Sequence, residues 1–124
     1  MAFGYIMLLV VLLIPLMMVG FGLVFMKNPP KINPFYGYKT KRSMMNQDTW
    51  AFAHRYFGKL WFVCGLVSLP ISLVPISLVV GKSEQVVSIT GLTVLVLQAV
   101  VMVGMMIPTE RALKKNFDEF GRPR

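Results

Sequence analysis

Three long stretches without a charged residue constrain the fold of this chain more than any other feature. Residues 2–26, 60–81 and 85–109 are runs of 25, 22 and 25 residues that lack Asp, Glu, Lys and Arg. A helix needs about 20 apolar residues to cross the hydrocarbon core of a bilayer, so each run is long enough. With 56% hydrophobic residues among 124, the chain has more apolar surface than one soluble domain can bury. The sequence predicts an all-α integral membrane protein with three transmembrane helices.

We place the spans near residues 3–26, 59–80 and 86–107 and treat residues 1–124 as one membrane domain. The first run is predicted to be a retained helix and not a secretory signal peptide. It has no basic n-region, its apolar stretch is too long, and no small-residue cleavage site follows it.

The distribution of charge predicts the orientation in the membrane. The loop 27–59 carries +6 of the formal net charge of +8, and the tail 108–124 carries the remaining +2. Two helices separate loop and tail, so both lie on one side. By the positive-inside rule that side is cytoplasmic, with the N-terminus outside and the C-terminus inside. Because topology accounts for the basic excess, we expect no nucleic-acid partner.

Polar and helix-breaking residues interrupt the apolar runs. The second span contains the tandem PISLV-PISLV with Pro70 and Pro75, and each proline removes a backbone donor from the helix. Either the kink is simply tolerated or the broken helix lines a cavity, as in transporters. Gln98, near the middle of the third span, needs a hydrogen-bond partner, normally on another helix. Whether that helix belongs to the same chain or to a homo-oligomer stays open.

A polar, basic insert at residues 27–58 separates the first two spans. Asn46 is typical of a helix N-cap, with Asp48 in the first turn, where the helix dipole favours negative charge. We predict a helix at 47–58 that lies at the membrane interface and either runs into the second span or bends into it at Gly58.

The tail after the third span is predicted to form a short surface helix. This helix would follow Pro108 and turn Leu113, Phe117 and Phe120 toward lipid.

The insert lacks the residues of a catalytic or metal site. The segment from Gly37 to Thr40 does not have the spacing of a phosphate-binding P-loop. His54 is the single histidine and has no carboxylate at an obvious supporting position. One histidine and the lone Cys64 in different parts of the chain do not make a metal site. We therefore expect a non-enzymatic protein with no catalytic residue, metal or cofactor.

The residue types of the insert favour recognition of an anion or a polar surface. Basic clusters beside a span attract anionic lipid by about 1 kcal/mol per residue, and Gly37 allows a tight turn or a close backbone approach. His54 is either a structural hydrogen-bonding group or a group that titrates near neutral pH. The candidate binding site consists of Asn33, Gly37, Lys39, Thr40, Arg42, Ser43, Asn46, Trp50, His54 and Arg55.

These residues resemble the signature of the SdpI family of bacterial membrane proteins. The pattern comprises Pro29-Pro30-Lys31-Ile32-Asn33, Gly37-Tyr38-Lys39-Thr40, Ser43, Asn46, Trp50, Ala53-His54 and Gly58. The founding member of that family protects a cell against a secreted toxin peptide and holds a transcriptional repressor at the membrane.

The resemblance implies an immunity or stress-protection protein in the bacterial cell membrane. Its implied partners are a toxin peptide or a regulatory protein, which the insert would recognise. Two alternatives stay open. The chain could bind or carry an anionic lipid or lipid-linked phosphate, or it could be a small subunit of a membrane assembly.

Overall fold

The computed structural model describes residues 2–124, which form four helices. These are α1 (Ala2–Lys27), α2 (Gln47–Val79), α3 (Glu84–Gly104) and α4 (Met106–Asn116). Three helical stretches, counting α3 and α4 as one, are long and apolar enough to cross a membrane. The predicted all-α class with three such helices is therefore confirmed.

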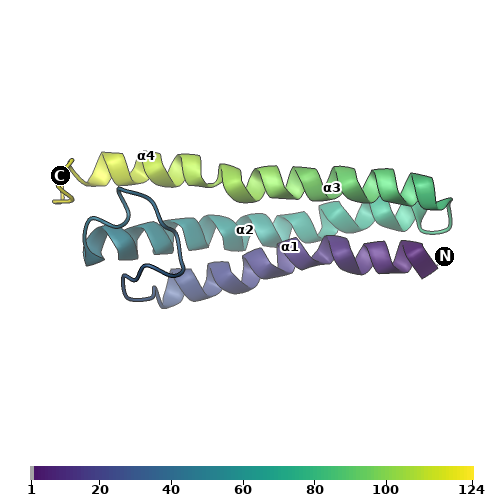
Figure 1. The fold of residues 1–124 in the computed structure, drawn as a ribbon, viewed down its shortest axis with the longest axis horizontal. Coiled ribbons are helices and arrows are strands. Elements are labelled where there is room, and N and C mark those ends of the chain that lie inside the picture. Colours follow the sequence, from purple (N-terminus) through teal and green to yellow (C-terminus); the bar gives the residue numbers. More distant parts are fainter. Residues whose placement is uncertain (1) are drawn as a thin grey trace.

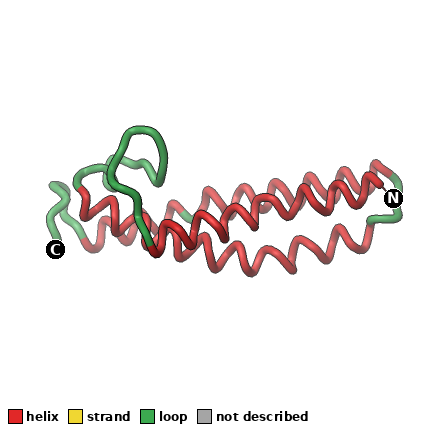
Figure 2. Tube along the Cα trace, turned by 90° about the horizontal axis from the view of Figure 1, so that it is seen from below, coloured by secondary structure: helices red, strands yellow, loops and turns green. Residues whose placement is uncertain are grey.

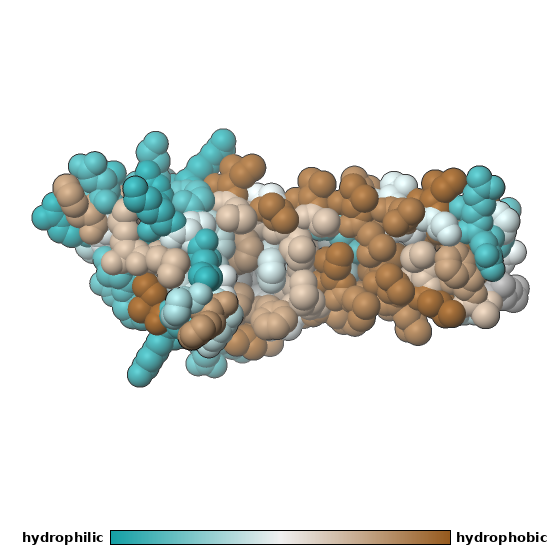
Figure 3. All heavy atoms as spheres, in the orientation of Figure 1, coloured by the Kyte–Doolittle hydropathy of each residue, from teal (hydrophilic) through white to brown (hydrophobic). Residues whose placement is uncertain are grey.

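The helices run side by side along one long axis, and the chain reverses direction at each end (Figure 1). The loop between α1 and α2 lies at the same end as the C-terminus, while the N-terminus lies at the other end (Figures 1 and 2). Hydrophobic residues cover the middle of the visible face, and hydrophilic residues gather at both ends (Figure 3). This arrangement suits a bilayer around the middle, with insert and tail on one side of it.

Helices α1 and α2 touch through glycine. A Cβ atom built on Gly22 would lie 2.6 Å from the carbonyl oxygen of Gly58, and one built on Gly58 would lie 2.6 Å from the carbonyl oxygen of Gly22. A Cβ on Gly65 would lie 2.8 Å from the carbonyl oxygen of Pro15. Small residues at such crossings allow two backbones to approach closely, which is how apolar helices gain packing energy in lipid.

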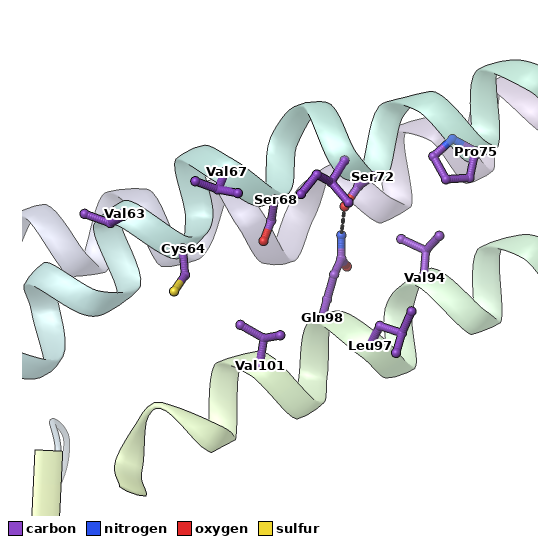
Figure 4. Close-up of a pocket in the computed structure, with 11 residues that line it drawn as sticks. Val63, Cys64, Val67, Ser68, Ser72, Pro75, Val94, Leu97, Gln98 and Val101 are labelled. Atoms are coloured by element: carbon purple, nitrogen blue, oxygen red, sulfur yellow. Dashed lines mark hydrogen bonds between the residues drawn. The ribbon is translucent and has the colours of Figure 1, made fainter. Parts of the chain in front are cut away.

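Gln98 joins the three long helices at mid-length. Pro15 lacks an amide hydrogen, so the carbonyl of Val11 has no helical donor. Gln98 Nε2 donates to that carbonyl oxygen at 2.8 Å and to Ser72 Oγ at 2.7 Å; Figure 4 shows the bond to Ser72. The predicted partner on another helix is confirmed, and it lies within the same chain.

Replacing Gln98 with leucine should destabilise the helix bundle. The variant leaves the buried carbonyl of Val11 without a donor, which costs about 1–3 kcal/mol. Denaturant unfolding of the detergent-solubilised protein measures this loss. Val96→Ala, at a side chain that is 60% exposed on the same helix, is the matched control. A Gln98→Leu variant as stable as this control would contradict the assigned role.

Two details of the predicted helices are settled by the structure. Helix α2 continues through Gly58, Pro70 and Pro75 without a break, so the 47–58 segment runs directly into the apolar run. The predicted lipid-facing position of Leu113 is wrong, because Leu113 is 1% exposed and packs with Tyr38 and other residues of the core. The insert folds over α4 and covers this side chain.

Candidate functional site

The irregular part of the insert, residues 28–46, is fixed to α2 through His54. The backbone N–H of Tyr38 donates to His54 Nε2 at 2.9 Å, and His54 Nδ1 lies 2.8 Å from the carbonyl oxygen of Trp50. Since Nε2 accepts a hydrogen bond, the ring proton must be on Nδ1, where it is donated to Trp50. The imidazole is fully buried. The imidazole of His54 is therefore neutral, and its Nε2 accepts a hydrogen bond from the backbone of the insert.

Gly37 makes this contact sterically possible. Its φ angle is +111°, a conformation that side-chain-bearing residues rarely adopt. A Cβ atom at this position would lie 2.5 Å from His54 Nε2 and 3.0 Å from the ring of Trp50. Glycine therefore lets the backbone rest directly against the two rings.

Trp50 and His54 of α2 together connect the insert and α1. Its Nε1–H donates to the carbonyl oxygen of Pro30 at 2.8 Å. The rings of Trp50 and His54 lie 4.3 Å apart between centroids, and Phe25 of α1 meets the imidazole edge-on at 4.9 Å. Such aromatic pairs add about 0.5–1.5 kcal/mol beyond the area they bury.

Ser43 and Asn46 organise the segment that enters α2. Ser43 Oγ donates to the carbonyl oxygen of Tyr38 at 2.8 Å and accepts from the backbone N–H of Thr40 at 2.9 Å. Asn46 Oδ1 accepts from the backbone N–H of Thr49, and Thr49 Oγ1 accepts from the backbone N–H of Asn46. This reciprocal pair is a capping box, so the predicted N-cap is confirmed. Thr49 was not among the predicted residues, because this position of a capping box usually holds Glu or Gln.

The C-terminal residues close over this cap. Asn46 Nδ2 donates to the carbonyl oxygen of Gly121 at 2.8 Å. The turn that presents Gly121 is held by Asp118, whose Oδ1 accepts from the backbone N–H groups of Arg122 and Phe120. The N–H of Arg122 in particular keeps the pKa of Asp118 below its ordinary value.

Tyr38 connects the insert to α4. Its hydroxyl donates to Glu110 Oε1 at 2.7 Å, and the carbonyl oxygen of Met106 lies 3.3 Å away. Burial, and then the Glu110 carboxylate, raise the pKa of Tyr38 above its ordinary value. Tyr38 and Glu110 were not among the predicted site residues, because they are 72 positions apart and no local pattern links them.

Tyr38→Phe should destabilise the protein by about 1.5–3 kcal/mol at neutral pH, the value of a hydrogen bond to a charged group. The raised pKa of Tyr38 also predicts a pH dependence. Above about pH 10 the unfolded chain ionises its tyrosine while the native tyrosine stays protonated, so this stabilisation is lost as pH rises. Unfolding of both proteins from pH 7 to 11 tests this. A constant difference between wild type and variant would contradict it.

The basic residues of the candidate site do not form one pocket. Lys41 and Arg42 line a cleft of about 390 Å³ together with Glu110 and Glu119, so its charge is mixed. Arg55 lines a separate surface cleft on α2. The ammonium group of Lys39 donates to the carbonyl oxygen of Pro34.

The structure also leaves the insert without the donor set of a metal centre. Within residues 2–124, no group of three or more His, Cys, Asp or Glu side chains lies close enough to hold a metal ion.

The insert exposes two adjacent aromatic side chains. Phe35 and Tyr36 are 86% and 58% exposed. Asn33 holds the turn that carries them, because its Oδ1 accepts from both of their backbone N–H groups at 3.0 Å. The turn belongs to the loop that stands out from the helices in Figure 2. We call residues 31–42 the display loop.

The candidate residues therefore fall into two groups. Gly37, Ser43, Asn46, Trp50 and His54 form a support beneath the display loop. The other candidate residues lie in the display loop, except Arg55, which is exposed on α2. Phe35 and Tyr36, the exposed aromatic residues of the loop, were not among the predicted site residues.

Comparison with known proteins gives two matches. The model of the SdpI/YfhL protein family matches residues 30–109, which include the whole candidate site. A Bacillus subtilis (strain 168) protein named "Uncharacterized protein YfhL" is 44% identical over 52 residues, which cover 41% of this chain and 47% of the relative. The matched part thus spans about half the length of that relative. No solved structure matches the chain.

Proposed function

Because the chain belongs to the SdpI/YfhL protein family, we propose that it is a non-enzymatic immunity or stress-protection protein of the bacterial cell membrane. In this proposal the display loop recognises a toxin peptide or a regulatory protein at the cytoplasmic face. The observation that carries the proposal is the division of the motif into a buried support and an exposed aromatic and basic surface.

The support gives the display loop the rigidity that recognition favours. Binding is weakened by the cost of ordering loops and side chains, and a loop that is already fixed avoids much of that cost. The backbone N–H groups of Phe35, Tyr38 and Thr40 in the display loop each donate a hydrogen bond to a side chain.

The exposed side chains have the composition of a binding surface. Aromatic residues dominate the energetic centres of protein interfaces, and Phe35 and Tyr36 are the large apolar side chains that the display loop exposes most. Lys31, Lys39 and Lys41 of the same loop are also exposed and carry positive charge. An amphipathic or acidic peptide segment would complement this surface.

A protection assay tests the proposed function. The chain is expressed in a sensitive bacterial strain, which is then challenged with a panel of membrane-active peptides. Wild type should raise the inhibitory concentration of at least one peptide, and Phe35→Ala with Tyr36→Ala should abolish this protection. Leu13→Ala, a 63% exposed position on α1, should protect like wild type. Absence of protection across the panel at verified expression would exclude the immunity role.

A second candidate function is binding of anionic lipid by the same loop. Aromatic residues beside lysines are typical of the headgroup region, which favours this candidate. Native mass spectrometry of the purified protein measures retained anionic lipid. Lys39→Ala with Arg42→Ala should reduce retention, whereas Lys82→Ala, in the connector at the opposite end of the bundle (Figure 1), should not. Unchanged retention in the double variant would rule the lipid function out.

A further inference from the structure

A cavity of about 370 Å³ lies between α2 and α3, at the level of Gln98. Figure 4 shows Gln98 reaching from α3 toward Ser72 on α2, with apolar side chains on both helices around it. The lining residues are Val63, Cys64, Val67, Ser68, Ile71, Ser72, Pro75, Val94, Leu97, Gln98 and Val101. None of them is charged, and all lie within the two apolar runs of these helices.

The Gln98 carboxamide in this wall has an unused acceptor. The backbone carbonyl oxygen of Val11 can only accept a hydrogen bond, so the Gln98 amide must turn its nitrogen, Nε2, toward α1. The amide oxygen, Oε1, then points away from Val11. The side chain is 5% exposed, and its Oε1 has no hydrogen-bond partner among the described residues. Leaving a buried amide oxygen unsatisfied is costly, so a molecule that brings a donor gains from meeting it.

Pro75 leaves one backbone carbonyl near this wall without its usual helical donor. Pro75 lacks an amide hydrogen, and the helical bond that it would have made is to the carbonyl of Ile71. Both residues line the cavity. The polar side chains of the wall, Ser68, Ser72 and Gln98, are all neutral. They lie far along the helix from the nearest lysines of α2 and the connector, Lys59 and Lys82.

These properties define the occupant. A charged headgroup would find no compensating charge in this wall, which makes its burial at this depth expensive. A whole helix, about 10–12 Å across, needs more volume than this cavity of about 370 Å³ offers. An engineered cavity of about 150 Å³ holds one benzene molecule, so this cavity has room for a substantial part of an alkyl chain.

We propose that the cavity between α2 and α3 binds a neutral long-chain molecule that carries a hydroxyl group. Neighbouring side chains move aside so that this hydroxyl donates to the buried Gln98 Oε1. The site takes its occupant laterally from the lipid and uses none of the residues of the display loop. If no such molecule binds in the cavity, the proposed protection role of the display loop is not affected.

Photolabelling of the intact protein in lipid nanodiscs tests the site. The probe is hexadecanol with a photoactivatable group in the chain and an alkyne tag, and labelled peptides are mapped by mass spectrometry. Labelling should be saturable and should map to the lining segments of α2 and α3. Unlabelled hexadecanol should compete at least about fivefold better than its methyl ether, which lacks the donor, as expected for one hydrogen bond. Competition by dioleoylglycerol shows whether a glycerolipid that carries a hydroxyl group can also occupy the cavity.

Substitutions that fill the cavity give a second readout. Val101→Trp and Val67→Trp, from opposite walls, should each reduce labelling, while Val96→Trp, on α3 outside the lining set, should leave it unchanged. Helical content and elution volume identify variants that fold. Equal competition by the ether, unaltered labelling in both folded cavity variants, or non-saturable labelling spread over all lipid-facing segments would each overturn the proposal.

Discussion

Gly58→Val is expected to separate α1 from α2 and to reduce stability by more than about 3 kcal/mol, the upper end for overpacking. The new side chain would begin 2.6 Å from the carbonyl oxygen of Gly22 and 2.7 Å from the backbone nitrogen of Met26. Both obstacles are backbone atoms of a helix, so a rotamer change cannot relieve the contact. Gly22→Val should have a similar effect, because it meets the same crossing from the other side.

Gly20→Val is the matched control for this crossing. A Cβ atom at Gly20 would have no heavy atom within 4 Å, so the substitution changes the same residue type on α1 without a clash. Denaturant unfolding in detergent and the elution profile of the protein compare the three variants. If Gly58→Val were as stable as Gly20→Val, the glycine-mediated contact of α1 with α2 would be wrong.

Gly37→Val is expected to detach the display loop while leaving the long helices folded. The positive φ of Gly37 costs a valine about 1–3 kcal/mol, and the 2.5 Å approach to His54 Nε2 adds a clash with a ring that is itself packed. The loop would lose its bond to His54, and residues 28–46 should then exchange their amide hydrogens much faster.

Hydrogen exchange read by mass spectrometry separates this local effect from global unfolding. In Gly37→Val the peptides of residues 28–46 should gain deuterium early, whereas those of α1 and α3 should keep their protection. Gly104→Val, where a Cβ atom meets nothing within 4 Å, should resemble wild type throughout. Protection of residues 28–46 that survives the substitution would show that Gly37 does not hold the loop in place.

Local sequence signals predicted much of this fold. Uncharged runs of sufficient length identify the long helices, and the residue types at Asn46 and Gly37 predict the N-cap and the tight approach that the structure contains. These features depend on a few neighbouring residues, so a single sequence contains the necessary information.

Contacts between distant segments could not be predicted in the same way. Nothing near Tyr38 indicates that its hydroxyl meets Glu110, and Leu113 looked lipid-facing because the insert that covers it is far away in sequence. The partners of Gln98 were equally hidden, since they depend on which carbonyl Pro15 leaves free on a neighbouring helix.

The candidate site shows the same limit. Ser43, Trp50 and His54 have the chemistry of binding residues, and the sequence does not reveal that they are buried as a support. Phe35 and Tyr36 look like ordinary apolar residues until the structure shows that they are exposed. The basic residues were expected to act together, whereas the fold distributes them over separate clefts.

The state of the His54 ring tests the central claim that the motif supports the display loop. Nitrogen NMR of the ¹⁵N-labelled protein in detergent at neutral pH distinguishes the two tautomers and the protonated ring. The structure predicts a neutral imidazole with the proton on Nδ1, an unprotonated Nε2 and a slowly exchanging amide at Tyr38. A ring protonated on Nε2, or a rapidly exchanging Tyr38 amide in the folded protein, would contradict the account.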